Sequence, residues 1–185
     1  KSNAHQGIIA FVAAYKYVHF EDIIKSASNK GKDPFIIILD KITDPHNLGS
    51  IIRTADAVGA DGIIIPKRRS VGLTAIVAKS SAGAVEYVPV AKVSNIAQTI
   101  DRIKEKGIWV IGAHMDGTKE HYNTDLKGPL ALVIGSEGKG ISRLIKEKCD
   151  FLVKLPMVGR VSSLNASVAA AVLMYEVFRQ KVNSS

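Results

Sequence analysis

Polar side chains that could hold and orient a ligand gather at three places in this sequence, each directly after an apolar run. TDPHNLGSIIR follows FIIILDKI, SEGKGIS follows LALVIG, and MVGRVSSLNAS follows FLVKLP. Amides, hydroxyls, a carboxylate and guanidinium groups at one site could orient a hydroxyl group and stabilise negative charge as it develops. The alternative for the amides and hydroxyls is that they cap the helices that follow. The candidates are Asn47, Arg53, Glu137, Arg160, Ser163 and Asn165.

The glycine, histidine and serine patterns exclude several familiar kinds of site. A dinucleotide-binding GxGxxG should follow the first strand, whereas GSEGKG comes late in the chain with a different spacing. The sequence has no GxxxxGKS/T phosphate loop, so ATP binding of that type is not expected. Its five histidines are scattered without HExxH or CxxC, so we expect no metal site. Ser163 lies in no GxSxG turn and has no evident His–Asp partner.

Apolar runs alternate with helical patterns, and this alternation predicts an α/β fold. Short β-branched runs, suited to strands buried on both faces, occupy residues 35–42, 61–66, 107–113, 130–135 and 151–156. Helical patterns occupy residues 47–60, 93–107, 141–149 and 167–182, and the first 30 residues predict a further strand and helix. Gly59, Gly107 and Gly140 stand at element ends, where left-handed backbone turns the chain. We therefore predict an open, mostly parallel sheet with helices on both faces.

The predicted sheet brings the polar segments together. Ligands of open α/β sheets bind at the carboxyl ends of the strands, where loops meet helix N-termini. Each of the three polar segments follows a predicted strand. They should therefore meet at one edge of the sheet and form a single site.

Composition predicts one globular domain with an excess of positive charge. The 185 residues carry a formal net charge of +8, which favours a polyanionic partner such as nucleic acid. The leading contacts are Lys67, Arg68 and Arg69, which could alternatively form a solvated loop. No apolar run approaches the roughly 20 residues of a membrane span, and KSNAHQG lacks a signal-peptide pattern. The single Cys149 suits packing in a reducing compartment, so we expect a cytoplasmic protein with no membrane partner.

Three long segments together resemble one known family. DPHNLGSIIRTADAVGADGIIIP, LALVIGSEGKGIS and LPMVGRVSSLNASVAAAVLMYE resemble, in order and spacing, the three motifs of the SpoU (TrmH-like) branch of the SPOUT RNA 2'-O-ribose methyltransferases. The resemblance covers residues from about 5 to 182. It implies a C-terminal trefoil knot, otherwise almost absent from proteins, with S-adenosylmethionine bound in it as methyl donor and no metal. HQGI and the length resemble the family members that methylate a guanosine 2'-oxygen of 23S rRNA.

The same resemblance implies a domain division and an assembly. Such enzymes carry an N-terminal L30e-like RNA-binding domain, so residues 1–7 are expected to be a linker from it. Residues 8–185 are expected to be the SpoU methyltransferase catalytic domain. Family members are dimers, which implies a homodimer whose interface includes part of the C-terminal helix. Two alternatives stay open: 2'-O-methylation of a tRNA guanosine, and an RNA-binding SPOUT protein without turnover.

The family's motifs imply roles for individual residues. The donor-contacting positions correspond to Ala113, Gly135, Leu155 and Leu164. Ordinary apolar packing is the alternative for these four. The polar catalytic set corresponds to Asn47, Arg53, Glu137, Ser163 and Asn165, with Arg160 as an RNA contact. We expect Gly135→Val to block donor binding by its bulk while the fold survives.

Arg53 is expected to act through its charge. A guanidinium has a pKa above about 12 and stays protonated, so it is a poor general base. The resemblance implies instead that Arg53 holds a phosphate and stabilises the developing 2'-oxyanion. Asn47 and Glu137 would position Arg53 on the first turns of its helix, and Ser163 and Asn165 would orient the ribose. The alternative is a surface arginine paired with a nearby aspartate.

Overall fold

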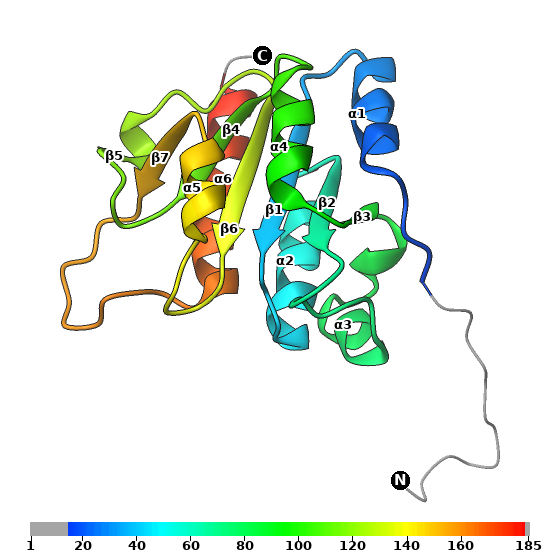
Figure 1. Cartoon of the computed structure of the whole chain (residues 1–185), viewed down its shortest axis with the longest axis horizontal. Coiled ribbons are helices and arrows are strands. Elements are labelled where there is room, and N and C mark those ends of the chain that lie inside the picture. The colour runs from blue at the N-terminus through cyan, green and yellow to red at the C-terminus, as the bar shows by residue number, and fades with distance from the viewer. Residues whose placement is uncertain (1–14, 184–185) are drawn as a thin grey trace, which may run out of the picture.

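Seven parallel strands form one sheet, with helices on both of its faces (Figure 1). The computed structural model describes residues 15–183. The strands are β1 (Phe35–Asp40), β2 (Gly62–Pro66), β3 (Val90–Val93), β4 (Trp109–Ala113), β5 (Lys119–Glu120), β6 (Leu130–Gly135) and β7 (Phe151–Lys154). The helices are α1 (Phe20–Asn29), α2 (Pro45–Ala57), α3 (Ala75–Ser80), α4 (Ile96–Lys104), α5 (Arg143–Lys148) and α6 (Ala166–Val182), with short 3-10 turns η1 (Ala84–Glu86) and η2 (His121–Asn123).

Most of the predicted elements are confirmed. Every pairing in the sheet is parallel, and all five predicted strands and all four helical patterns are present within a few residues of their expected ends. The helix expected within the first 30 residues is α1. The strand expected before α1 falls almost wholly in residues 1–14, outside the described residues, and so does the expected linker.

The strand order β3-β2-β1-β6-β4-β7-β5 determines which loops are neighbours. The chain moves outward from β1 to β3, returns through α4 to β4, and only then places β6 between β1 and β4. Strands β1 and β6 pair along their full length, from Phe35 with Leu130 to Asp40 with Gly135. Because all strands run the same way, the loops after β1, β6, β4 and β7 emerge side by side at the carboxyl edge.

The central strands are buried on both faces, as their continuous apolar sequences require. Ile37 and Leu39 of β1 face a core shared with α2, α3 and α6. Ile36 and Ile38 of the same strand face a second core shared with α1, α4 and α5. Successive side chains of a strand point to opposite faces, so an all-apolar strand needs a helical layer on each side.

Local sequence signals set where the helices begin and where the chain turns. The Asp44 carboxylate accepts a hydrogen bond from the backbone N–H of His46 over 2.7 Å and caps α2. Gly59, Gly107 and Gly140 have φ angles of 69°, 75° and 63°, which confirms the left-handed turns expected there. Among the helices of residues 15–183, none is both long and apolar enough to cross a membrane.

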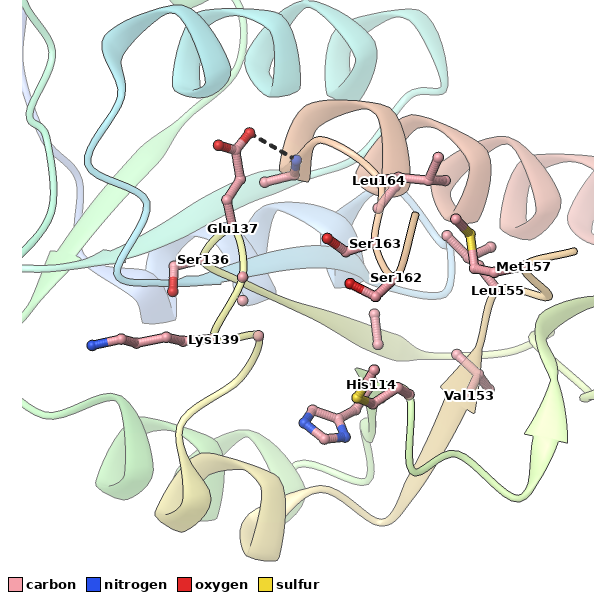
Figure 2. Close-up of a pocket in the computed structure, with 17 residues that line it drawn as sticks. His114, Ser136, Glu137, Lys139, Val153, Leu155, Met157, Ser162, Ser163 and Leu164 are labelled. Atoms are coloured by element: carbon pink, nitrogen blue, oxygen red, sulfur yellow. Dashed lines mark hydrogen bonds between the residues drawn. The ribbon is translucent and has the colours of Figure 1, made fainter. Parts of the chain in front are cut away.

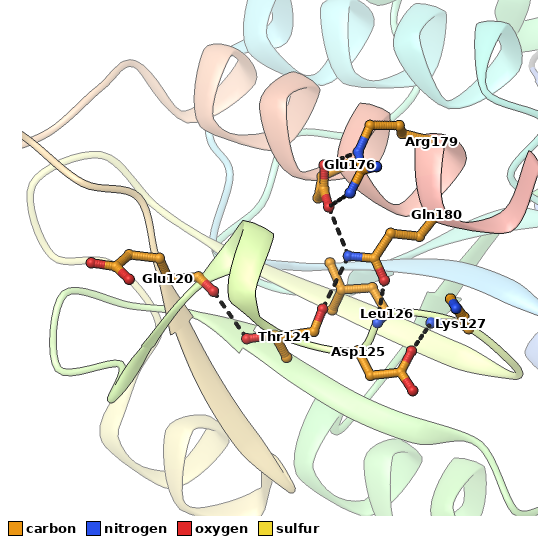
Figure 3. Close-up of polar contacts among 8 residues, drawn as sticks. All are labelled: Glu120, Thr124, Asp125, Leu126, Lys127, Glu176, Arg179 and Gln180. Carbon is orange, nitrogen blue, oxygen red and sulfur yellow. Dashed lines mark hydrogen bonds and ion pairs between the residues drawn. The ribbon is translucent and has the colours of Figure 1, made fainter. Parts of the chain in front are cut away.

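The C-terminal helix is held against the segment that joins β4 to β6 (Figure 3). The buried side chain of Gln180 in α6 accepts from the Leu126 N–H over 2.9 Å and donates to the Thr124 carbonyl over 3.0 Å. Strand β5 of the same segment pairs with β7. The β4–β6 segment is thus fastened both to β7 and to the helix that follows it, an interlocked path that agrees with the expected knot.

Candidate active site

A cavity of about 180 Å³ opens at the carboxyl edge of the sheet, where the loops after β4, β6 and β7 meet (Figure 2). We call it the donor cavity. Two residues of the expected catalytic set, Glu137 and Ser163, line the cavity. Its walls are apolar side chains and loop backbone, with a few polar groups. All four expected donor contacts line it: Ala113, Gly135, Leu155 and Leu164.

The loop between β6 and α5 closes tightly on itself at Gly135. Ser136 and Gly140 form an isolated antiparallel bridge, and Gly138 and Gly140 both have positive φ angles. A Cβ added to Gly135 would lie 2.0 Å from the carbonyl carbon of Gly140 and 2.1 Å from the backbone nitrogen of Ile141. The expectation that the fold survives Gly135→Val is therefore wrong, because the new side chain meets fixed backbone rather than open space.

Asn47, Glu137 and Asn165 form a hydrogen-bonded group beside the donor cavity, which we call the amide–carboxylate cluster. Asn47 Nδ2 donates to Glu137 Oε1 over 3.1 Å, and Asn165 Nδ2 donates to Asn47 Oδ1 over 3.0 Å and to Glu137 Oε1. The Ala166 N–H donates to the same Glu137 oxygen over 3.3 Å. Among the described residues Glu137 Oε2 accepts no hydrogen bond, which leaves it available to a ligand.

The capping alternative has a different outcome for each of the two asparagines. Asn165 caps α6, since its Oδ1 accepts from the Ser167 and Val168 N–H groups, while its Nδ2 serves the cluster. Asn165 therefore both caps α6 and takes part in the cluster. Asn47 is the third residue of α2, which Asp44 caps, so the capping interpretation of Asn47 is wrong. Asn47 is only 7% exposed, and its amide is committed to the cluster.

Within a single chain, Arg53 is not part of the amide–carboxylate cluster. It is the ninth residue of α2, in the third turn rather than the first two, and its side chain is exposed. Six residues of helix separate it from Asn47, which turns it about 120° away from that residue. Within residues 15–183, no hydrogen bond or ion pair joins Arg53 to Asn47 or Glu137, so the expected positioning of Arg53 by these two side chains is not met. Nor does Arg53 pair with Asp56 or Asp61 in that part of the chain.

The remaining expected contacts are exposed on loops at the same edge. Lys67, Arg68 and Arg69 follow β2 directly and are exposed. Arg160 and Ser163 lie in the exposed loop between β7 and α6, and Ser163 lies beside the donor cavity (Figure 2).

His114 is a cavity residue that the sequence analysis missed. It lines the donor cavity directly after β4, and its Nδ1 accepts from the Asp116 N–H over 3.1 Å. Asp116 in turn accepts from Lys146 over 2.7 Å, and this contact holds the pKa of the Asp116 carboxyl below its ordinary value. His114 follows the predicted strand 107–113, so the rule that strand ends carry ligand contacts could have identified it.

Two further predictions concern the packing role of Cys149 and the absence of a metal site. Burial raises the pKa of the Cys149 thiol to about 12, so the thiol is neutral and behaves as a packing group, as predicted. In the described part of the chain, no group of three or more His, Cys, Asp or Glu side chains could hold a metal ion.

Comparison with known proteins gives a consistent result. The sequence profile of the SpoU rRNA Methylase family matches residues 34–175. A Bacillus subtilis protein named as a TrmH family tRNA/rRNA methyltransferase, YacO, is 62% identical over 177 residues, which are 96% of this chain and 71% of YacO. A Staphylococcus haemolyticus protein named in the same way is 56% identical over the same shares.

Solved structures share the fold. The SpoU methyltransferase AviRb of Streptomyces viridochromogenes, determined with its cofactor AdoMet, superposes with a TM-score of 0.76 at 33% identity, over 81% of this chain and 58% of AviRb. An AdoMet-bound rRNA methyltransferase of Sinorhizobium meliloti gives a TM-score of 0.77 at 28% identity, over 89% and 61%. The chain thus spans about three fifths of these solved enzymes. The knotted α/β fold is that of SPOUT methyltransferases, and the chain belongs to the SpoU family of S-adenosylmethionine-dependent RNA methyltransferases.

Proposed function

We propose that this chain methylates the 2'-oxygen of a guanosine ribose in 23S rRNA, in the cytoplasm, with S-adenosylmethionine as donor. One observation carries the proposal: Glu137 lines the donor cavity and also anchors the amide–carboxylate cluster. The cluster, which we propose as the acceptor site, thus adjoins the donor cavity, and a direct transfer requires the two reactants to be bound side by side.

The donor cavity suits S-adenosylmethionine. Its Leu155 and Leu164 side chains offer apolar contact to a flat base, and Gly135 and the loop that follows it form another part of the wall. The loop from Ser136 to Gly140 is held closed on itself, so the backbone facing the cavity is fixed before a ligand binds. The bound donor supplies a sulfonium-activated methyl group, which the ribose 2'-oxygen takes up directly.

The polar residues would orient the acceptor ribose. Glu137 Oε2 accepts no hydrogen bond from residues 15–183 and can accept one from a ribose hydroxyl. The Ser163 hydroxyl lies beside the donor cavity and can hold the same sugar. Asn47 and Asn165 fix the other Glu137 oxygen and so fix the carboxylate plane.

We further propose a homodimer through α6. Five apolar side chains of this helix are more than a third exposed and recur at helical spacing: Val168, Val172, Tyr175, Phe178 and Val182. A continuous apolar helix face of this kind usually marks an interface. Helix α2 packs beside α6 on the same face of the sheet, so a second copy docked on α6 comes close to the exposed Arg53. Arg53 then serves the partner's site, where it holds phosphate and stabilises the developing 2'-oxyanion.

Mixing two inactive variants tests this assignment of Arg53. Arg53→Ala should bind the donor normally and lose about a hundredfold to a thousandfold in rate, as for loss of one charge-stabilising group. Arg53→Lys should recover only part, because an ammonium cannot make the planar two-pronged contact. If each site combines Arg53 of one chain with Glu137 of the other, equal amounts of Arg53→Ala and Glu137→Ala protein regain about a quarter of wild-type activity. No recovery after subunit exchange would contradict the shared site, and a monomer in light scattering would contradict the dimer.

Mapping 2'-O-methyl groups in rRNA and tRNA from cells with and without the gene tests the substrate. The proposal predicts that one 23S rRNA guanosine loses its methyl group. Loss confined to a tRNA position would favour the tRNA alternative. No loss in any RNA would favour an RNA-binding protein without turnover.

A further inference from the structure

A second hollow, of about 270 Å³, lies at the same carboxyl edge but on the far side of β1. It opens between the end of β3, the start of α1 and the first turns of α4. We call it the basic pocket, because Lys67, Lys92 and Arg102 line it. Lys67 follows the last residue of β2, and Lys92 lies within β3, so neighbouring strands supply the two lysines.

The charges in the basic pocket do not balance. Glu21 is the only acidic residue among those that line it, and Glu21 pairs with Arg102. Within residues 15–183, neither Lys67 nor Lys92 forms an ion pair. Lys92 is half-buried, and its ammonium lies 4.9 Å from the centre of the Tyr17 ring. Two positive charges are thus left for an anion from outside.

Tyr17 also fixes the loop that carries the predicted RNA contacts. Its hydroxyl accepts from the Leu73 N–H over 2.8 Å, and the Val71 N–H donates to the Ile42 carbonyl over 2.9 Å. Both ends of the stretch after β2 are therefore tied to the body of the protein, since the Lys67 N–H donates to the Val93 carbonyl over 2.8 Å. The backbone that carries Lys67 is therefore held in place before a ligand arrives, which lowers the entropic cost of binding.

The position of the basic pocket relates it to the donor cavity. The donor cavity adjoins β6, and the basic pocket adjoins β2 and β3, two and three strands away in the sheet order. Neighbouring strands lie about 4.8 Å apart, so roughly 10 to 15 Å of sheet edge separate the two hollows. One RNA strand lying along this edge can occupy both.

We propose that the basic pocket binds backbone phosphates of the substrate RNA flanking the methylated nucleotide, with Lys67 and Lys92 as the phosphate contacts. The inference rests on the proposed RNA methylation and adds to it a second, fixed anchor away from the chemistry. Contacts to phosphate set the position of the strand and carry no base preference. The pocket therefore contributes affinity and register, not the choice of nucleotide.

The test measures binding of in vitro transcribed 23S rRNA to the purified chain over a range of KCl concentrations. The double variant Lys67→Gln/Lys92→Gln is compared with Lys106→Gln, an exposed lysine at the opposite edge of the sheet. Each lost phosphate contact lowers the slope of log K against log salt by about 0.7 to 0.9. For the double variant, the slope of log K against log salt should thus be smaller in magnitude by about 1.5. Its affinity at 0.15 M salt should be lower by on the order of tenfold. The variant Lys67→Arg/Lys92→Arg should keep the slope and the affinity of the wild type.

Two outcomes separate this inference from the proposed function. Affinity and slope of the Lys67→Gln/Lys92→Gln variant equal to those of Lys106→Gln would overturn the basic pocket as a phosphate site, even if the wild-type chain methylates RNA. A wild-type chain that transfers no methyl group, while the double variant still loses slope, would overturn the proposed function and leave the basic pocket supported. Calorimetry with S-adenosylmethionine should give the same affinity for the double variant and wild type, and a loss there would count against the inference.

Discussion

Asn165 links the stability of α6 to the geometry of the active site, and replacing it separates the two roles. Asn165→Ala removes the cap of α6, worth about 1 kcal/mol. It also removes the amide that donates to Asn47 Oδ1 and Glu137 Oε1, worth about 1 kcal/mol net. We expect a loss of about 2 kcal/mol in unfolding free energy, or about 4 to 8 °C in Tm. Asn95→Ala is the matched control, because Asn95 caps α4 through Gln98 alone and should cost about half as much.

Asn165→Asp makes the prediction sharper. The aspartate can still cap α6, but it puts a second carboxylate against Glu137 Oε1, where the amide now donates. Two adjoining carboxylates raise the folded-state pKa of one of them above its unfolded value. The stability of this variant is then greatest below that unfolded value, near pH 4, and falls by about 1.4 kcal/mol per unit of pKa shift as pH rises through the folded pKa.

Urea unfolding from pH 4 to pH 8 measures this directly. Relative to wild type, Asn165→Asp should lose stability steadily with rising pH, whereas the deficit of Asn165→Ala should be nearly independent of pH. The reasoning would be refuted if Asn165→Asp matched wild type at pH 8, or if Asn165→Ala cost no more than Asn95→Ala.

Three further predictions follow from single contacts. Gly135→Ala should abolish donor binding in calorimetry and lower Tm, because its Cβ overlaps loop backbone, while Gly159→Ala, which meets nothing within 4 Å, should do neither; equal behaviour of the two would contradict the overlap. Cys149, with its pKa raised by burial from 9.0 to about 12, should resist iodoacetamide at pH 8 until urea unfolds the chain, and its contribution to stability should be lost as pH rises from 9 toward 12; rapid labelling of folded protein would exclude this burial. The hydrogen bond from Arg179 lowers the pKa of Glu176, so Glu176→Gln should destabilise the chain at pH 7 and do so progressively less as pH falls below the pKa of Glu176 in the unfolded chain. Thermal melts measure this, and a difference in Tm between variant and wild type that does not change with pH would argue against the pair.

Much of the fold could be predicted because burial on both faces leaves a plain sequence signal. Runs such as FIIIL have apolar residues at every position, which is the pattern of a strand covered on both faces. Strands β3 and β5 and helix α3 were missed. Lys92 interrupts the apolar residues of β3, and β5 consists only of the charged pair Lys119–Glu120. Helix α3 has a single buried residue, Val77, so its sequence shows no apolar period.

The site could be predicted as a set of residues but not as a set of contacts. Asn47, Glu137 and Asn165 stand 90 and 28 residues apart in sequence, and their adjacency depends on β6 being placed beside β1, a late step in the chain order. The turn on which Arg53 lies depends on the exact start of α2, which Asp44 sets two residues earlier than the apolar pattern indicated. The angle between Arg53 and Asn47 follows from their spacing in a helix and could have been predicted. The overlap at Gly135 depends on how the following loop folds back, and no local pattern encodes that distance.

Transfer of labelled methyl from S-adenosylmethionine to in vitro transcribed 23S rRNA by the purified chain, followed by nucleoside analysis, tests the central claim most directly. The account predicts label in 2'-O-methylguanosine at one position, and loss of most of that label with Arg53→Ala. Label on a base, label only when tRNA replaces rRNA, or no transfer at all by a chain that binds the donor would contradict it.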